Sequence, residues 1–177
     1  MLTNPSWDTP RFEIVRDHFR DIDPDQGTIS HGVGRSPWTG EAIDGDYIKH
    51  EAQCGRMGQM LYAVVTKRHG GLDYRTPTEK DIAAVEQAGL ALDTGRSLWE
   101  AGDLMPIEEI GNVSNYDRGH RLYGICRWAD FFAPRQLVAM AIITSSLREL
   151  YQELRRQLTE ERSTAIQAYL GVMLDKM

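Results

Sequence analysis

The sequence has few cysteines and no long hydrophobic run. Only Cys54 and Cys126 occur among its 177 residues, and neither belongs to a Cys-x-x-Cys pair or to a His/Cys ligand set. We expect both thiols to be reduced and buried. No apolar stretch approaches the roughly 20 residues that span a bilayer, which argues against membrane insertion. The first ten residues lack the basic and apolar regions of a secretory signal, so we expect a cytoplasmic protein.

The motifs of common enzyme classes are also absent from the sequence. It contains no Walker-type phosphate loop, no His-Glu-x-x-His helix and no Gly-x-Ser-x-Gly turn. The five histidines never recur four residues apart, so no helix of this chain presents a histidine pair to a metal ion. We therefore assign no catalytic residue and no metal ligand, and a small independent enzyme is disfavoured.

The charge is acidic overall but unevenly distributed. A net charge of −6 argues against a general nucleic-acid coat, because such proteins are usually basic. Basic and aromatic residues nevertheless gather after residue 117, and such clusters bind phosphate groups and bases. The same residues can instead form surface ion pairs, with arginine stems packed on aromatic rings. The cluster consists of Arg118, Arg121, Tyr123, Arg127, Trp128 and Arg135.

Residues 1–72 are predicted to form mainly strands and turns. Alternating or β-branched runs predict strands over 11–16, 28–30 and 46–52, and the most convincing strand covers 60–66. Asp44-Gly45, just before the third of these runs, is a typical tight-turn pair. We therefore expect a small antiparallel sheet in this part.

Residues 73–177 are predicted to be mainly helical. In Thr76-Pro77-Thr78-Glu79 we expect Thr76 and Glu79 to form the capping pair, with Pro77 at the first helical position, which predicts a helix over 77–92. Apolar residues recur every three or four positions from Pro134 to about Leu158 and again over 160–174, which predicts an antiparallel C-terminal hairpin. We expect a loop over 95–116 with an apolar anchor at 104–110. The chain is thus predicted to be a single α+β domain, with the sheet packed against several helices.

One segment has the outline of a zinc knuckle without its ligands. In Ser36-Pro37-Trp38-Thr39-Gly40 the two hydroxyl residues stand where a Cys-Pro-x-Cys-Gly turn would have thiolates. Hydroxyl groups are poor zinc ligands, and a structural site needs four good ones, so we expect no zinc here. Trp38 is predicted to pack in the turn in place of the metal, burying apolar surface worth roughly 1.5–3 kcal/mol.

Three segments resemble the zinc-ribbon-containing adenine-specific DNA methylase family, large methyltransferases often encoded near bacterial antiphage genes. They are SPWTGEAIDGDYIKHEAQCGRMGQMLYAVVTKR (36–68), YRTPTEKDI (74–82) and YGICRWADFFAPRQL (123–137). The match is most specific over 123–137 and over 44–68. For 123–137 the family pattern is Tyr-Gly-x-x-x-Trp-Gly/Ala-Asp-Leu/Phe-Phe-x-Pro-Arg-Gln-Leu. The resemblance covers about two thirds of the chain and matches the middle of the family's proteins.

The resemblance implies a context of DNA adenine methylation with S-adenosylmethionine as the cofactor of the full-length family. The family's cofactor-binding and catalytic loops have no counterpart here, so we expect no cofactor in this chain and no methylation by the chain alone. The expected function is a noncatalytic DNA-recognition or scaffold segment of a larger methylase-like protein, or a separately encoded subunit. The alternative is a protein-interaction module of an antiphage or restriction-modification-like system.

The candidate residues follow from the basic and aromatic cluster and from the resemblance. The predicted DNA contacts are Arg118, Arg121, Arg127, Trp128 and Arg135, with Lys67 and Arg68 as weaker companions. A structural role is the alternative. Trp38 would pack in the knuckle turn, and Pro134 would occupy the first turn of the helix that begins there. Asp130 would cap that helix and pair with Arg135, and Phe131 and Phe132 would pack beneath it. Expected partners are DNA, the catalytic methyltransferase portion and, through the C-terminal helices, a second copy.

Overall fold

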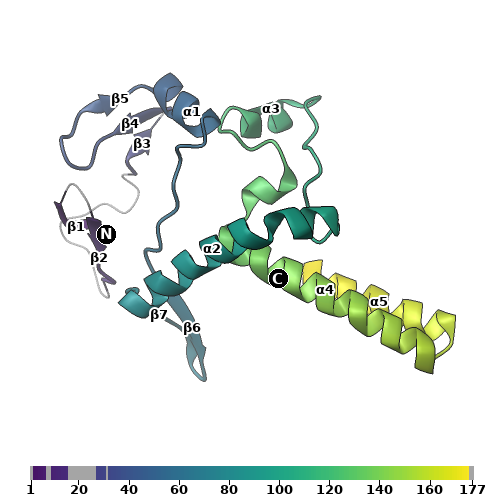
Figure 1. Ribbon diagram of the computed structural model, residues 1–177. Coiled ribbons are helices and arrows are strands. Elements are labelled where there is room, and N and C mark those ends of the chain that lie inside the picture. The colour runs from purple at the N-terminus through teal and green to yellow at the C-terminus, as the bar shows by residue number, and fades with distance from the viewer. Residues whose placement is uncertain (1, 7–8, 16–26, 31, 176–177) are drawn as a thin grey trace. The chain divides into compact units, whose positions relative to one another are not determined.

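A computed structural model describes residues 2–6, 9–15, 27–30 and 32–175 of the chain (Figure 1). Its architecture is α+β, as predicted, with small antiparallel sheets in the N-terminal part and five α-helices among the described residues. The chain divides into two compact units. The first consists of Met1–Ala83 and Gly111–Cys126, and the second of Ala84–Ile110 and Arg127–Met177.

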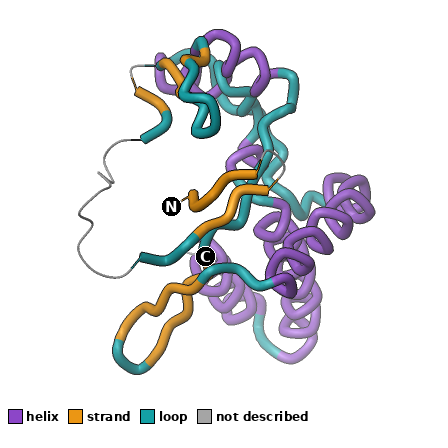
Figure 2. Tube along the Cα trace, turned by 90° about the vertical axis from the view of Figure 1, so that its left-hand side faces the viewer, coloured by secondary structure: helices purple, strands orange, loops and turns teal. Residues whose placement is uncertain are grey.

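The strands of the first unit form three separate antiparallel sheets, orange in Figure 2. The first sheet pairs β1 (Leu2–Ser6) with β2 (Thr9–Phe12). The second has three strands in the order β3 (Ile29–Ser30), β4 (Val33–Arg35) and β5 (Ala42–Ile43). The third is a hairpin of β6 (Val64–Arg68) and β7 (Gly71–Arg75). The short strand predicted within 28–30 is confirmed. The strand expected over 60–66 begins only at Val64, and β2 ends at Phe12, before most of the run predicted over 11–16. Residue 16 itself lies outside the described residues.

Residues 46–52 are helical, so the strand predicted there is wrong. Helix α1 (Gly45–Gln53) begins where the carboxylate of Asp44 accepts a hydrogen bond of 2.7 Å from the backbone nitrogen of Asp46. An aspartate in this position satisfies a free donor of the first helical turn. Asp44-Gly45 is therefore a helix start and not a tight turn.

Helix α2 (Glu79–Ala101) confirms the helix predicted over 77–92 but is longer at its C-terminal end. Its N-terminal capping pair is Thr78 and Asp81, since the Asp81 side chain accepts from the Thr78 nitrogen at 2.7 Å. Thr76 and Glu79, the predicted pair, lie outside this contact. The helix continues through Gly95, over which the Trp99 ring packs so closely that a Cβ would approach ring atoms to 2.7 Å.

The second unit has the larger buried core. Met105 and Ile110 are each only 3% exposed, which confirms the apolar anchor predicted at 104–110. After it come a 3-10 helix, η1 (Trp128–Phe131), and the antiparallel pair α4 (Pro134–Gln157) and α5 (Glu160–Asp175), the predicted C-terminal hairpin (Figure 1). The central cluster consists of Leu92, Met105, Ala129, Leu137 and Ala141, with Trp99, Leu104, Ile107, Phe132 and Val138 packed around it.

Neither cysteine is buried, contrary to the prediction. Cys54 is exposed at the end of α1, where its Sγ lies 3.7 Å from Nε2 of His50, and Cys126 is half-buried; both are free thiols. Among the described helices, none combines the length and apolar character needed to cross a membrane.

Candidate nucleic-acid interface

The predicted arginine cluster divides between the two units. Arg118 and Arg121 belong to the first unit, on helix α3 (Asn115–Arg121), whereas Arg127 and Arg135 belong to the second. Each pair is therefore described within its own unit. Contact of either set with DNA remains a prediction.

The two arginines of α3 have local structural roles. Nε of Arg118 donates a hydrogen bond of 3.3 Å to the carbonyl oxygen of Asn112, and Arg121 is half-buried. Both lie in the last turn of α3, where positive charge is favourable beside the carbonyl end of the helix dipole. These contacts favour support of the fold over contact with phosphate groups.

Helix η1 is fastened to the loop that carries the apolar anchor. The backbone nitrogen of Trp128 donates to the carbonyl of Glu108 at 3.1 Å, and that of Ala129 donates to the carbonyl of Pro106 at 2.7 Å. A single antiparallel bridge joins Glu109 to the residue just before η1. The backbone of η1 is thus held by the loop, while the side chains of Trp128 and Phe131 remain exposed.

Two aromatic side chains of η1 project from this support. Trp128 is 51% exposed and Phe131 is 42% exposed, and their ring centroids lie 6.0 Å apart with 34° between the planes. Aromatic rings this large usually bury most of their surface in a core. The exposed guanidinium residues Arg127 and Arg135 precede and follow the pair in the sequence. We name Trp128 and Phe131 the aromatic platform.

The other residues of this motif hold the turn between η1 and α4. The Asp130 carboxylate accepts from the backbone nitrogen of Arg127 at 2.8 Å, so it caps η1 and not the helix that follows. At the start of α4, Pro134 occupies the first turn as predicted, and Oε1 of Gln136 accepts from the Ala133 nitrogen at 2.8 Å. Phe132, unlike Phe131, packs on the core.

A small pocket of about 130 Å³ adjoins η1 in the second unit. It is smaller than the 300–1,000 Å³ typical of small-molecule sites. Apolar side chains form most of its walls, and two charged residues contribute at its edge. The lining residues are Leu92, Arg96, Ala129, Asp130, Phe132, Pro134 and Leu137.

The degenerate knuckle turn is closed by hydrogen bonds. Oγ of Ser36 accepts from the backbone nitrogens of Trp38 and Thr39 at 3.3 and 3.1 Å, and Oγ1 of Thr39 accepts from the nitrogen of Glu41 at 3.3 Å. Backbone bonds between Ser36 and both Gly40 and Glu41 complete the turn. Trp38 remains 39% exposed, so it is less buried than the predicted replacement for a metal. The two hydroxyl groups hold the turn instead.

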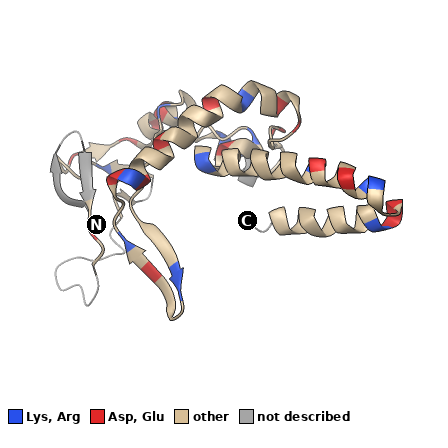
Figure 3. Ribbon diagram, turned by 60° about the horizontal axis from the view of Figure 1, so that its bottom comes forward, with Lys and Arg blue, Asp and Glu red and all other residues tan. Residues whose placement is uncertain are grey.

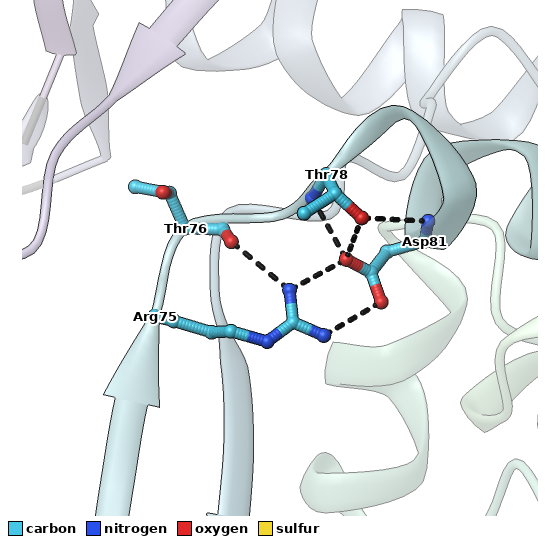
Figure 4. Close-up of polar contacts among 4 residues, drawn as sticks. All are labelled: Arg75, Thr76, Thr78 and Asp81. Atoms are coloured by element: carbon cyan, nitrogen blue, oxygen red, sulfur yellow. Dashed lines mark hydrogen bonds and ion pairs between the residues drawn. The ribbon is translucent and has the colours of Figure 1, made fainter.

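Lys67 and Arg68, the weaker candidates, lie near the tip of the β6–β7 hairpin and are exposed. The base of the hairpin is tied to the start of α2 by an ion pair, drawn in Figure 4. Arg75 donates through Nη1 to Oδ2 of Asp81 at 2.6 Å and through Nη2 to Oδ1 at 2.9 Å. These bonds, with those from Thr78, hold the pKa of the Asp81 carboxyl well below its usual range.

Comparison with models of protein families, with curated proteins and with solved structures finds no match for the chain. Within the described ranges, no three His, Cys, Asp or Glu side chains gather in a way that could hold a metal ion.

Proposed function

We propose that the chain is a noncatalytic DNA-contacting segment of a methylase-like protein, and that the aromatic platform on η1 contacts unpaired bases. The observation that carries the proposal is the exposure of Trp128 and Phe131 as a neighbouring pair on a fixed backbone. The methylase context, with S-adenosylmethionine bound by the catalytic portion, comes from the sequence resemblance described above.

Stacking explains why such a platform suits DNA. Every base has a flat π-face, so an exposed aromatic ring can stack on a base of any identity, with roughly 1–3 kcal/mol per base. Enzymes that methylate a base first take it out of the duplex and leave the base opposite it unpaired. Arg127 and Arg135 add positive charge for the phosphates beside such bases.

The buried residue beneath the aromatic platform favours a binding role for the two exposed rings. Ala129, between the two aromatic residues, is 5% exposed and belongs to the core of the second unit. The backbone that carries the rings is therefore held in place before a ligand arrives, which reduces the entropy lost on binding. A flexible loop with the same residues would lack this advantage.

Binding of a short fluorescein-labelled single strand, measured by fluorescence anisotropy, tests the proposal. We expect Trp128→Ala to weaken binding about tenfold or more, since one stacked base contributes roughly 1–3 kcal/mol. Trp38→Ala is the matched control, because Trp38 is also exposed but lies in the first unit. Equal losses from both variants, or none from Trp128→Ala, would contradict a role for the platform.

A second function, protein binding, is favoured by helix α5. Three of its four charged residues, Glu160, Glu161 and Arg162, lie at its N-terminal end, and most of the remaining ribbon is uncharged, as Figure 3 shows. Ile166, Leu170 and Leu174 are half-buried on one side, but Tyr169 is 77% exposed, and Val172 and Met173 are also exposed. A helix that is apolar on all sides is usually covered. The cover would be the catalytic portion or a second copy of the chain.

Light scattering coupled to size exclusion tests the second function for the case of a second copy. If copies cover α5, the chain forms a dimer and Met173→Glu restores the monomer, because the new carboxylate would enter an apolar contact. Gln167→Glu, on the same helix but at a polar position, is the control. A monomeric wild-type chain would leave the catalytic portion as the partner to test.

A further inference from the structure

The β6–β7 hairpin has a short turn and two distinct faces. Arg68 pairs with Gly71, so the turn contains only His69 and Gly70, and Gly71 has a φ of 130°, a conformation that side-chain-bearing residues rarely adopt. Figure 2 shows the resulting narrow ribbon, with its turn in teal at the far end. The two strands make their extensive contacts with each other.

Positive charge is concentrated at the free end of this ribbon. Lys67, Arg68 and His69 follow one another there, on a protein whose net charge is −6. The acid beside them is Asp73, whose Oδ2 lies 3.4 Å from Nε of Arg68. Because the Arg68 side chain is three-quarters exposed, this ion pair is weakly stabilising and can be exchanged for a phosphate contact.

Apolar side chains occupy the face that carries Lys67. Lys67 is directly opposite Leu72, and Val65 is opposite Tyr74, so these four side chains share one side of the ribbon. Leu72 is 62% exposed, and Val65 and Tyr74 are also exposed. This combination differs from a major-groove reader, which recognises base edges chiefly through hydrogen-bonding side chains.

We infer that the β6–β7 hairpin is an arm that enters the minor groove of duplex DNA, with Lys67 and Arg68 on the phosphates and Leu72 wedged against a base step. The inference rests on the proposed DNA-binding function and names a second ligand, the intact duplex flanking the unpaired bases. Proteins that kink DNA insert apolar side chains between base steps from the minor groove, and cationic neighbours hold the backbone. The side chains at the end of this hairpin have that composition.

The base of the hairpin is anchored to helix α2. The double hydrogen bond between Arg75 and Asp81 ties the last residue of β7 to the first turn of α2 (Figure 4). A bidentate arginine–carboxylate contact fixes direction as well as distance. A wedge displaces base pairs only if its own support does not yield.

The test uses the full chain and a short duplex carrying a donor dye at one end and an acceptor at the other. Anisotropy reports binding, and energy transfer between the dyes reports bending. We expect the wild-type chain to raise the transfer efficiency at saturation, since insertion of a wedge kinks a duplex by roughly 20–90°. Lys67→Ala with Arg68→Ala should weaken duplex binding at least tenfold, and Leu72→Ala should bind the duplex but no longer bend it.

Two controls match these changes. Arg155→Ala with Arg156→Ala removes another exposed adjacent basic pair, from α4, and Leu90→Ala removes a comparably exposed leucine from α2. Leu72→Met keeps an apolar wedge and should still bend the duplex. Circular dichroism establishes that each variant is folded.

The outcomes separate this inference from the proposed function. Duplex binding and bending that are unchanged in all hairpin variants would overturn the arm while the single-strand result with Trp128→Ala stands. Duplex binding without bending by the wild-type chain would overturn the wedge. A wild-type chain that binds neither DNA would overturn both. Hairpin variants that alter only the oligomeric state would also overturn the arm, in favour of a protein partner.

Discussion

Gly124 lies so close to the end of α1 that a methyl group on its Cα would come within 2.5 Å of the carbonyl oxygen of Ala52. Its φ of 75° is also one that side-chain-bearing residues rarely adopt. Beside it, Nε2 of Gln53 donates to the carbonyl of Leu122 at 3.2 Å. Gly124 and Leu122 therefore join the segment after α3 to the end of α1 within the first unit.

We predict that Gly124→Ala destabilises the first unit by about 1–3 kcal/mol, because both the backbone conformation and the space at Ala52 oppose a Cβ. Urea unfolding followed by circular dichroism measures the change. Gly119→Ala is the matched control, since no atom lies within 4 Å of a Cβ placed there and the residue is within α3. Equal stability of the two variants would show that the close approach is not essential.

The contact between Asp81 and Arg75 should survive in acid. The lowered pKa of Asp81, caused first by the hydrogen bonds from Arg75 and then by those from Thr78, means that the ionised carboxylate is the bound form. Its contribution to stability is therefore complete above the ordinary aspartate pKa of about 3.9 and is lost as the pH falls through the lower folded-state value.

Nuclear magnetic resonance measures this titration at the amide of Thr78, which donates to the Asp81 carboxylate. We expect a midpoint clearly below the ordinary aspartate value, and a shift of the midpoint toward that value in Arg75→Gln, where the guanidinium donors are gone. A wild-type midpoint at or above about 3.9 would contradict the bidentate contact.

The knuckle turn should depend on the hydroxyl of Ser36. Ser36→Ala removes the acceptor for the nitrogens of Trp38 and Thr39, and we expect a loss of about 1 kcal/mol, similar to the loss of a helix cap. Amide hydrogen exchange at these two residues should accelerate. Ser36→Thr keeps the oxygen and is expected to exchange like the wild-type chain; protection that persists in Ser36→Ala would mean that the backbone bonds suffice.

Helices α4 and α5 and the start of α2 were predictable because their signals are local. The apolar spacing after Pro134 and the capping residues near Thr78 act within one or two helical turns, so the sequence alone places α4, α5 and the start of α2. The strand predicted over 46–52 was wrong because the local signal there is ambiguous. Asp44-Gly45 suits either a tight turn or a helix start, and the local pattern does not distinguish them.

The candidate site was less predictable, because burial and long-range contacts decide it. Their closeness in sequence groups Arg118 and Arg121 with Arg127 and Arg135. In the structure the first two belong to the first unit and the last two to the second, a division that the sequence does not indicate. The exposure of Phe131 and the burial of its neighbour Phe132 depend on packing with residues that are distant in sequence. The alternation of Leu72 and Tyr74 on β7 was visible in the sequence and could have indicated the exposed face of the hairpin.

Salt dependence of DNA binding tests the central claim, contact between this chain and DNA, most directly. Anisotropy of a labelled single strand is measured between about 50 and 200 mM salt for the wild-type chain, for Arg127→Ala with Arg135→Ala, and for Arg155→Ala with Arg156→Ala as the control. We predict that the affinity of the wild-type chain falls steeply with salt. In Arg127→Ala with Arg135→Ala, the slope of log affinity against log salt concentration should be reduced by roughly one for each phosphate contact removed, whereas the control variant should keep the wild-type slope. An absence of binding at the lowest salt, or an identical slope for all three proteins, would contradict the claim.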